Sequence, residues 1–319
     1  MRAFQVTDFD APPALATLSS PKPGPDEVLI AVRACGLNFA DLLAANGKYQ
    51  ERRAPPFTLG MEVAGEVIAC GPEVTALRAG QRVAAFTGAG GLAEQVAVPA
   101  ARALPLPEEM PFDDAAAFQV AYGTSHLALD EKARLAPGET LLVLGAAGGV
   151  GLTAVEIGKR MGARVIACAR GPEKLAIAEK AGADHLIDSS DADLREAVLA
   201  LGGADVVYDP VGGAAFTAAF RATRPDGRIL VVGFASGDVP PIPANHMLVK
   251  NITVIGFWWG GYLAFAPDKL TGSLATLFDW YGSGGLRPHI SHRLPLSQAA
   301  EGLELLRSRQ STGKIVITP

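Results

Sequence analysis

The pattern of hydrophobic and polar positions divides the chain into two parts of different character. Between about residues 18 and 99, short runs rich in β-branched residues alternate with proline and glycine turns, as in VLIAVRA, EVAGEVIA and QRVAAF. Short apolar runs between turn signals predict an irregular, mostly β domain.

The pattern changes at about residue 140. The runs LLVLG, ARVIACA, DHLID and DVVYD are separated by helical stretches at 150–161, 172–181 and 192–201, and RILVVGF and NITVIGF follow. Strands alternating with helices predict right-handed βαβ units and a parallel, doubly wound sheet. The chain ends in KIVITP, a short strand that we expect to rejoin the first domain. We therefore expect one domain of residues 1–118 with 258–319 and a second of residues 119–257.

Composition narrows the class of protein. The 319 residues are 49% hydrophobic and 19% charged, as in soluble globular proteins, and the length suits two domains. A net charge of −5 without a Lys/Arg cluster argues against a nucleic-acid partner. With neither a signal-peptide pattern nor an apolar run of about 18 residues, we expect a cytoplasmic protein that does not bind membranes. The three scattered cysteines predict no disulfide framework.

A glycine-rich turn, AAGGVG, carries the clearest chemical signal. It places Gly145, Gly148, Gly149 and Gly151 between a predicted strand and a predicted helix. Such a turn brings backbone N–H groups and a helix N-terminus to a pyrophosphate, where a Cβ would obstruct the approach. The sequence therefore predicts dinucleotide binding.

The residues after the second strand of this domain bear on which dinucleotide is bound. NAD enzymes usually carry a carboxylate there for the ribose hydroxyls, but this chain reads ACARGPEK. Ala169 supplies no negative charge, whereas Arg170 and Lys174 supply cations that a 2′-phosphate would attract. We therefore expect NADPH rather than NADH.

The order of motifs along the whole chain resembles the medium-chain dehydrogenase/reductase superfamily, and within it the quinone oxidoreductases. The segments that carry this resemblance are GLNFADLLAANGKY, AAGGVG, VVYDPVGG, VVGFASG and TGKIVITP. The resemblance implies an α/β fold with a GroES-like, mostly β catalytic domain and a Rossmann coenzyme domain. It also implies a homodimer joined through the Rossmann edge strands.

The residues at the zinc positions depart from the zinc alcohol dehydrogenases of that superfamily. Asn38 and Met61 stand where those enzymes carry cysteine and histidine, and Val120 stands at the third ligand position. These side chains do not form the thiolate and imidazole shell of zinc. The five histidines form no metal-binding pattern, so we expect no bound metal.

The resemblance also implies roles for individual residues. It assigns nicotinamide and ribose contacts to Asn38 and Thr124, and it places Tyr49 in the substrate cleft. The remaining implied cofactor contacts are Gly148, Gly149 and Val150 at the diphosphate, Lys174 and Arg309 at the 2′-phosphate, and Gly233, Phe234 and Ala235 against the cofactor. Arg170 joins the 2′-phosphate group on charge alone. Two departures from the family are Glu156 and Leu43, which stand where members carry glutamine and tyrosine.

These features predict hydride transfer to a quinone or an activated alkene. Such an acceptor spreads incoming charge over its own π-system and needs no metal to polarise it. Asn38 and Tyr49 are expected to hold the acceptor oxygen, with Tyr49 or water delivering the proton. Two alternatives stay open: an enone, enal or enoyl-thioester reductase, and a non-catalytic NADPH-binding sensor or structural protein.

Overall fold

The structure, a computed structural model, describes all 319 residues and divides into two compact units. The first unit comprises Met1–Val120 and Arg287–Pro319, and the second comprises Ala121–Leu286. Residues 258–286, which we expected in the first domain, group with the second unit. Their long helix is tied there by a hydrogen bond of 2.8 Å between His126 Nδ1 and Ser273 Oγ and by the Arg160 guanidinium, 4.8 Å from the Trp280 ring centroid.

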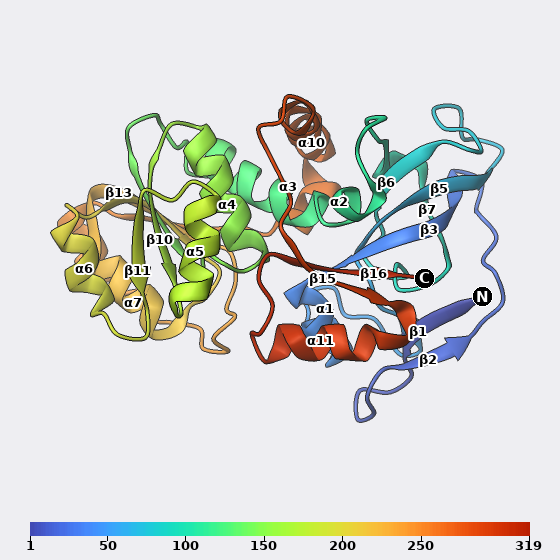
Figure 1. The fold of residues 1–319 in the computed structure, drawn as a ribbon, viewed down its shortest axis with the longest axis horizontal. Coiled ribbons are helices and arrows are strands. Elements are labelled where there is room, and N and C mark those ends of the chain that lie inside the picture. Colours follow the sequence, from blue (N-terminus) through green and yellow to red (C-terminus); the bar gives the residue numbers. More distant parts are fainter. The chain divides into compact units, whose positions relative to one another are not determined.

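The first unit is built around the long strand β3 (Glu27–Leu37), the third strand of a mostly antiparallel sheet (Figure 1). The order in this sheet is β15-β16-β3-β5-β6-β8, and β7 also pairs with β3. Its other strands are β5 (Glu62–Cys70), β6 (Arg82–Phe86), β7 (Gln95–Pro99), β8 (Ala103–Pro105), β15 (Ile290–Pro295) and β16 (Lys314–Thr318). A second sheet has the order β2-β1-β4, formed by β2 (Ala14–Thr17), β1 (Arg2–Val6) and β4 (Phe57–Thr58).

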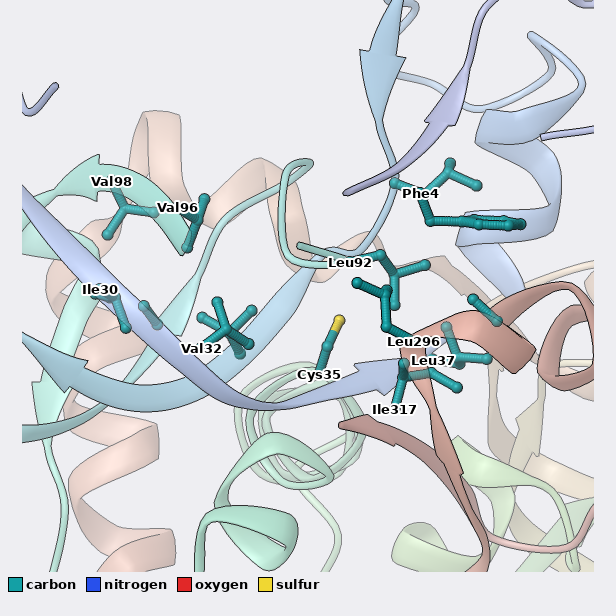
Figure 2. Close-up of a cluster of buried hydrophobic side chains, with 14 of the residues drawn as sticks. Phe4, Ile30, Val32, Cys35, Leu37, Leu92, Val96, Val98, Leu296 and Ile317 are labelled. Carbon is teal, nitrogen blue, oxygen red and sulfur yellow. The ribbon is translucent and has the colours of Figure 1, made fainter. Parts of the chain in front are cut away.

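The apolar core of the first unit collects side chains from both ends of the chain. Figure 2 shows Ile30, Val32 and Cys35 of β3 beside Val96 and Val98 of β7. Leu296 and Ile317 from the C-terminal segment pack into the same cluster. The final strand therefore belongs to this unit, as the sequence pattern predicted. The helices here are α1 (Phe39–Ala45), α2 (Phe112–Ala116) and α11 (Ala299–Arg307).

The second unit contains a parallel sheet with the strand order β11-β10-β9-β12-β13-β14. Its strands are β9 (Thr140–Leu144), β10 (Arg164–Ala169), β11 (His185–Asp188), β12 (Ala204–Asp209), β13 (Thr223–Val231) and β14 (Thr253–Gly256). The helices are α4 (Gly149–Arg160), α5 (Pro172–Lys180), α6 (Leu194–Ala200), α7 (Gly213–Ala222), α8 (Ala244–Lys250), α9 (Tyr262–Phe265) and α10 (Pro267–Gly282). Helix α3 (Gln119–Leu127) begins at the end of the first unit and continues into the second. Every strand of this sheet overlaps a run predicted from the sequence.

Helices cover both faces of the parallel sheet. On one face, α6 and α7 pack Val198, Phe216 and Phe220 against inward-facing strand residues such as Leu142 and Ile166. On the other, α4 approaches so closely that a Cβ on Gly158 would lie 2.4 Å from Leu141 Cδ2. From β9 the chain adds β10 and β11 on one side of the sheet, and it then adds β12, β13 and β14 on the other side of β9. The strand order therefore reverses between β9 and β12. In such sheets the crevice for a ligand opens at the carboxyl ends of the strands at this point. No helix has the length and apolar character needed to span a lipid bilayer.

Candidate functional site

A cluster of buried polar side chains lies at one end of the large sheet of the first unit. Its members are Asn38, Asp41, Glu62 and Lys314, of which Glu62 and Asp41 are fully buried and Lys314 is 4% exposed. The sheet register brings three of them together, because Leu37 pairs with Ile315 of β16 and Gly36 pairs with Glu62 of β5. We call these four residues the polar cluster.

The polar cluster is organised around the Lys314 ammonium. Lys314 Nζ donates to Glu62 Oε1 at 2.8 Å and to Asn38 Oδ1 at 2.6 Å. Asn38 Nδ2 donates to the same Glu62 oxygen at 2.9 Å, while Glu62 Oε2 accepts the Val120 N–H at 2.9 Å. Both carboxylate oxygens and the ammonium are therefore paired, as buried charges require.

These contacts fix which way the Asn38 amide points. An ammonium has only donors, so the atom facing Lys314 must be the amide oxygen, and the atom facing Glu62 must be the nitrogen. The second amide proton is directed to the Gly36 carbonyl oxygen at 3.3 Å. Both amide protons are thus directed at protein acceptors, and only a lone pair on Oδ1 remains. This differs from our expectation that Asn38 would donate to an acceptor oxygen.

Asp41 holds the start of α1 in place. Its Oδ2 accepts the Asn38 backbone N–H at 2.8 Å, and its Oδ1 accepts the Gly60 N–H at 3.1 Å. Burial raises the pKa of Asp41 to about 6, although these hydrogen bonds and Lys314 oppose the rise. The carboxylate links the turn before β5 to the segment that carries Asn38.

The three positions that correspond to zinc ligands do not offer a zinc shell. Asn38 is committed to Lys314 and Glu62, Met61 is a buried thioether, and Val120 contributes only its N–H to Glu62. The positive charge of the Lys314 ammonium would also repel a metal cation at this position. The chain has no group of three or more His, Cys, Asp or Glu side chains that could hold a metal ion.

Tyr49 lines a pocket beside the polar cluster. Its lining includes Tyr49, which follows α1, together with Asp41, Leu59 and Met61. Arg52 and Arg53 also line the pocket, and Arg53 lies 3.6 Å from the Glu51 carboxylate. The lining therefore combines apolar side chains with charges of both signs.

In the second unit, the glycine turn joins β9 to α4 as the sequence predicted. Gly145 has a φ of +59°, and a Cβ on Gly151 would lie 2.2 Å from the Gly145 carbonyl oxygen. Helix α4 begins at Gly149, and its first N–H groups have no partner within the helix. The turn therefore presents Gly148, Gly149 and Val150 at a helix N-terminus suited to phosphate.

A network of buried hydroxyl groups is hydrogen-bonded to the first turn of α4, and the sequence pattern did not predict it. Ser125 Oγ donates to the Val150 carbonyl oxygen at 2.9 Å and lies 2.8 Å from Thr153 Oγ1 and 3.0 Å from Tyr208 Oη. Burial raises the pKa of Tyr208. Thr124, the predicted ribose contact, precedes Ser125 on α3 and is 7% exposed. Because these hydroxyl residues lie far apart in the sequence and form no motif, their hydrogen-bond network could not be predicted from the sequence.

The predicted 2′-phosphate residues lie in two places. Arg170 follows β10 directly and is exposed, and Lys174 lies in the first turn of α5. Between them, Gly171 donates its N–H to both oxygens of Asp188, at 3.0 and 3.1 Å. This carboxylate, at the end of the neighbouring strand β11, was not anticipated. Arg309 is exposed after α11 in the first unit.

The segment Gly233–Ala235 follows β13 at the carboxyl edge of the sheet. The Ala235 N–H donates to the Pro210 carbonyl oxygen at 3.0 Å, which joins this segment to the loop after β12. Asp209 stabilises that loop, because its Oδ1 accepts N–H groups from Val211 and Gly212 at 2.7 and 2.9 Å. Phe234 is left 39% exposed. The loops after β9, β12 and β13 thus meet at one edge, as a dinucleotide crevice requires.

Comparison with known proteins gives the same family from sequence and from structure. The family "Alcohol dehydrogenase GroES-like domain" matches residues 24–108, and "Zinc-binding dehydrogenase" matches residues 149–277. A quinone oxidoreductase-like protein 2 homolog of Nematostella vectensis is 39% identical over 300 residues, which cover 92% of this chain and 82% of that protein.

Two solved structures are similar over the full length. The quinone oxidoreductase of Thermus thermophilus, whose NADPH complex is known, is 36% identical with a TM-score of 0.88 and full coverage of both chains. The Escherichia coli quinone oxidoreductase complexed with NADPH is 27% identical with a TM-score of 0.92, again with full coverage of both. The chain therefore belongs to the quinone oxidoreductase family of the medium-chain dehydrogenases/reductases and is an oxidoreductase.

Proposed function

We propose that this oxidoreductase uses NADPH to reduce a quinone or a similar conjugated acceptor, and that it does so without zinc. The observation that carries the proposal is the set of residues at the zinc-ligand positions: Met61 is a buried thioether, and Asn38 and the Val120 N–H are bonded to a Lys314–Glu62 ion pair. Without a Lewis acid at this point, reduction is easiest for an acceptor that delocalises the incoming charge itself.

The second unit supports the choice of cofactor. The cradle between Gly145 and Gly151 suits a diphosphate, and Gly233, Phe234 and Ala235 offer a surface at the same sheet edge. Arg170 and Lys174 follow Ala169, with Arg309 as a further cation for the 2′-phosphate. NADPH, when bound, supplies the hydride. The solved relatives that bind NADPH support the same choice.

The first unit supplies the acceptor pocket in this proposal. In this proposal the acceptor binds beside Tyr49, which donates a hydrogen bond to the acceptor oxygen, while Leu59 and Met61 supply apolar surface in the same lining. The Oδ1 lone pair of Asn38 is assigned to a hydrogen-bond donor of the cofactor, and Thr124 to the ribose or nicotinamide. The proton that follows the hydride comes from Tyr49 or from water.

A second candidate is reduction of an enone or an enoyl thioester that carries negative charge. The feature that favours it is Arg52 in the pocket lining, where its guanidinium would attract an anionic acceptor, whereas Arg53 lies 3.6 Å from the Glu51 carboxylate. Hydride transfer to the β-carbon of such an acceptor places the same demands on the site.

We also propose that the protein is a homodimer joined along β14. This strand is the edge of the parallel sheet, and exposed edges are usually paired or covered. The adjacent helix α8 has no buried residue and exposes Leu248 and Val249 by 79% and 82%. A twofold contact would cover both elements.

Steady-state oxidation of NADPH with a panel of 1,2- and 1,4-quinones, neutral enones and crotonyl thioesters tests the proposal. We expect turnover with quinones, without added zinc and unchanged after dialysis against a chelator. Preference for crotonyl thioesters, lost in Arg52→Ala, would establish the second candidate. NADPH binding without turnover of any acceptor would favour a sensor, and activity that is lost on chelation and restored by zinc would refute the zinc-free reaction.

A further inference from the structure

The Lys314–Glu62 pair has no role in the reaction proposed above, yet it is the most deeply buried ion pair of the chain. Its two side chains are 4% and 0% exposed, whereas the other ion pairs involve side chains that are at least 21% exposed. The free energy lost when two charges are removed from water can exceed the free energy gained from their attraction inside the protein. An apolar pair of similar volume is therefore often as stable. Stability alone therefore does not account for the pair.

The surroundings of the pair show what it touches. Lys314 and Glu62 both contact the Asn38 amide, one at each end, at 2.6 Å and 2.9 Å. Gly36 leaves room for this arrangement, because a Cβ there would lie 2.9 Å from Glu62 Oε1 and 2.1 Å from the Ala116 carbonyl oxygen. The Glu62 carboxylate is held from its other side by the Val120 N–H.

A neutral amide can rotate by half a turn with little change in shape, which exchanges its donor and its acceptor. The Lys314 ammonium prevents this, since the flipped amide would place its NH₂ group against a cation and its oxygen against a carboxylate. Two unfavourable contacts would replace two charge-assisted hydrogen bonds. The pair therefore selects one of two orientations of similar shape, and the longer contact of the amide with the Gly36 carbonyl oxygen, at 3.3 Å, favours the same one.

We propose that Lys314 and Glu62 are positioning residues that lock the Asn38 amide with its oxygen lone pair available to the cofactor. This inference rests on the proposed function, in which Asn38 contacts NADPH. It assigns the pair a role through Asn38 and not through contact with the acceptor.

The test is a double-mutant cycle on kcat/KM and on the Kd for NADPH, measured by fluorescence titration. Lys314→Met alone leaves Glu62 buried without its partner and should lower Tm by roughly 10 °C. The neutral pair Lys314→Met/Glu62→Gln should recover most of that Tm. It should still reduce kcat/KM at least about tenfold, because only the 3.3 Å contact with the Gly36 carbonyl oxygen then holds the amide.

The decisive comparison is in an Asn38→Ala background. There the Lys314→Met/Glu62→Gln change should alter kcat/KM and the Kd for NADPH by less than about twofold, because no amide remains to be oriented. An effect as large in Asn38→Ala as in the native background would overturn the proposal, and so would native kcat/KM in the neutral-pair variant. If the neutral-pair variant does not fold, Glu62→Gln alone is compared in the native and Asn38→Ala backgrounds. We expect it to lower kcat/KM only in the native background, and by less than the neutral pair would. If the native protein turns over no acceptor, the proposed reaction fails, and the Kd values still decide the role of the pair.

Discussion

Asp41 is a carboxylic acid buried among backbone donors, so its protonation is linked to folding. Its pKa rises from an ordinary 3.8 to about 6 in the folded chain, mainly through burial. Because the folded pKa is the higher one, its contribution to stability is complete below about pH 3.8 and is lost as pH rises through about 6. At about 1.36 kcal/mol per tenfold change in proton affinity, the loss is about 3 kcal/mol.

We therefore expect Asp41→Asn to change the pH dependence of unfolding. Relative to the native protein, the free energy of unfolding of the variant should rise by about 3 kcal/mol between pH 3 and pH 7, because Asn has no charge to bury. Urea titrations across this range measure the difference. Asp10→Asn, which removes a carboxylate at an exposed position, is the matched control. Parallel profiles for native protein and Asp41→Asn would contradict the assignment.

Substitution of a single residue, Lys174, also tests the preference for NADPH over NADH. Lys174→Ala should raise KM for NADPH by about tenfold, on the order of 1.4 kcal/mol, because one charge-assisted contact to the 2′-phosphate is lost. KM for NADH should change by less than about twofold, since NADH has no phosphate at that position. Lys180→Ala, at the other end of α5, is the matched control and should affect neither. Equal weakening of both cofactors would show that Lys174 does not recognise the phosphate.

At the scale of elements, the turn between β9 and α4 tolerates no side chain at Gly151. A Cβ there would meet a backbone oxygen at 2.2 Å, and a backbone atom cannot rotate away as a side chain does. Gly151→Ala should therefore destabilise the second unit by roughly 1 to 3 kcal/mol and weaken NADPH binding.

Gly272 provides the matched control for this prediction. It lies inside α10 with no atom within 4 Å of the added Cβ. Gly272→Ala should raise stability by roughly 0.5 to 1 kcal/mol, because alanine favours the helix, and should leave NADPH binding unchanged. Thermal unfolding and fluorescence titration measure both variants. Unchanged NADPH affinity in Gly151→Ala would show that the turn does not bind the diphosphate.

At the scale of the whole molecule, the proposed dimer predicts a specific sensitivity at β14. Thr253 is exposed on this edge strand, so Thr253→Lys should leave the fold intact while placing two like charges near a twofold axis. We expect the dimer dissociation constant to rise roughly tenfold, corresponding to about 1.4 kcal/mol. Sedimentation velocity at micromolar concentration measures it. The same substitution at exposed Thr271 on α10 should have no effect, and a monomeric native protein would remove the proposal.

The sequence by itself determined the features that depend on neighbouring residues. Strand and helix periodicities located every strand of the parallel sheet. The signal is strongest for β9, β10 and β12, because these strands bury runs of adjacent side chains. The glycine turn could be recognised because its steric demands act within seven residues, from Gly145 to Gly151. Ala169, Arg170 and Lys174 were found in the same way, as residues at or directly after the end of a predicted strand.

Only the tertiary structure decided which distant residues meet. Lys314 contacts Asn38 across 276 positions, through strand pairings that no local pattern specifies. The Asp188 carboxylate reaches Gly171 because β11 lies beside β10, and residues 258–286 join the second unit through contacts of α10 with His126 and Arg160. Local periodicity reflects burial of one face of one segment, whereas the polar cluster depends on the register between three strands. The residues assigned to orient Asn38 could therefore be named only once the chain was folded.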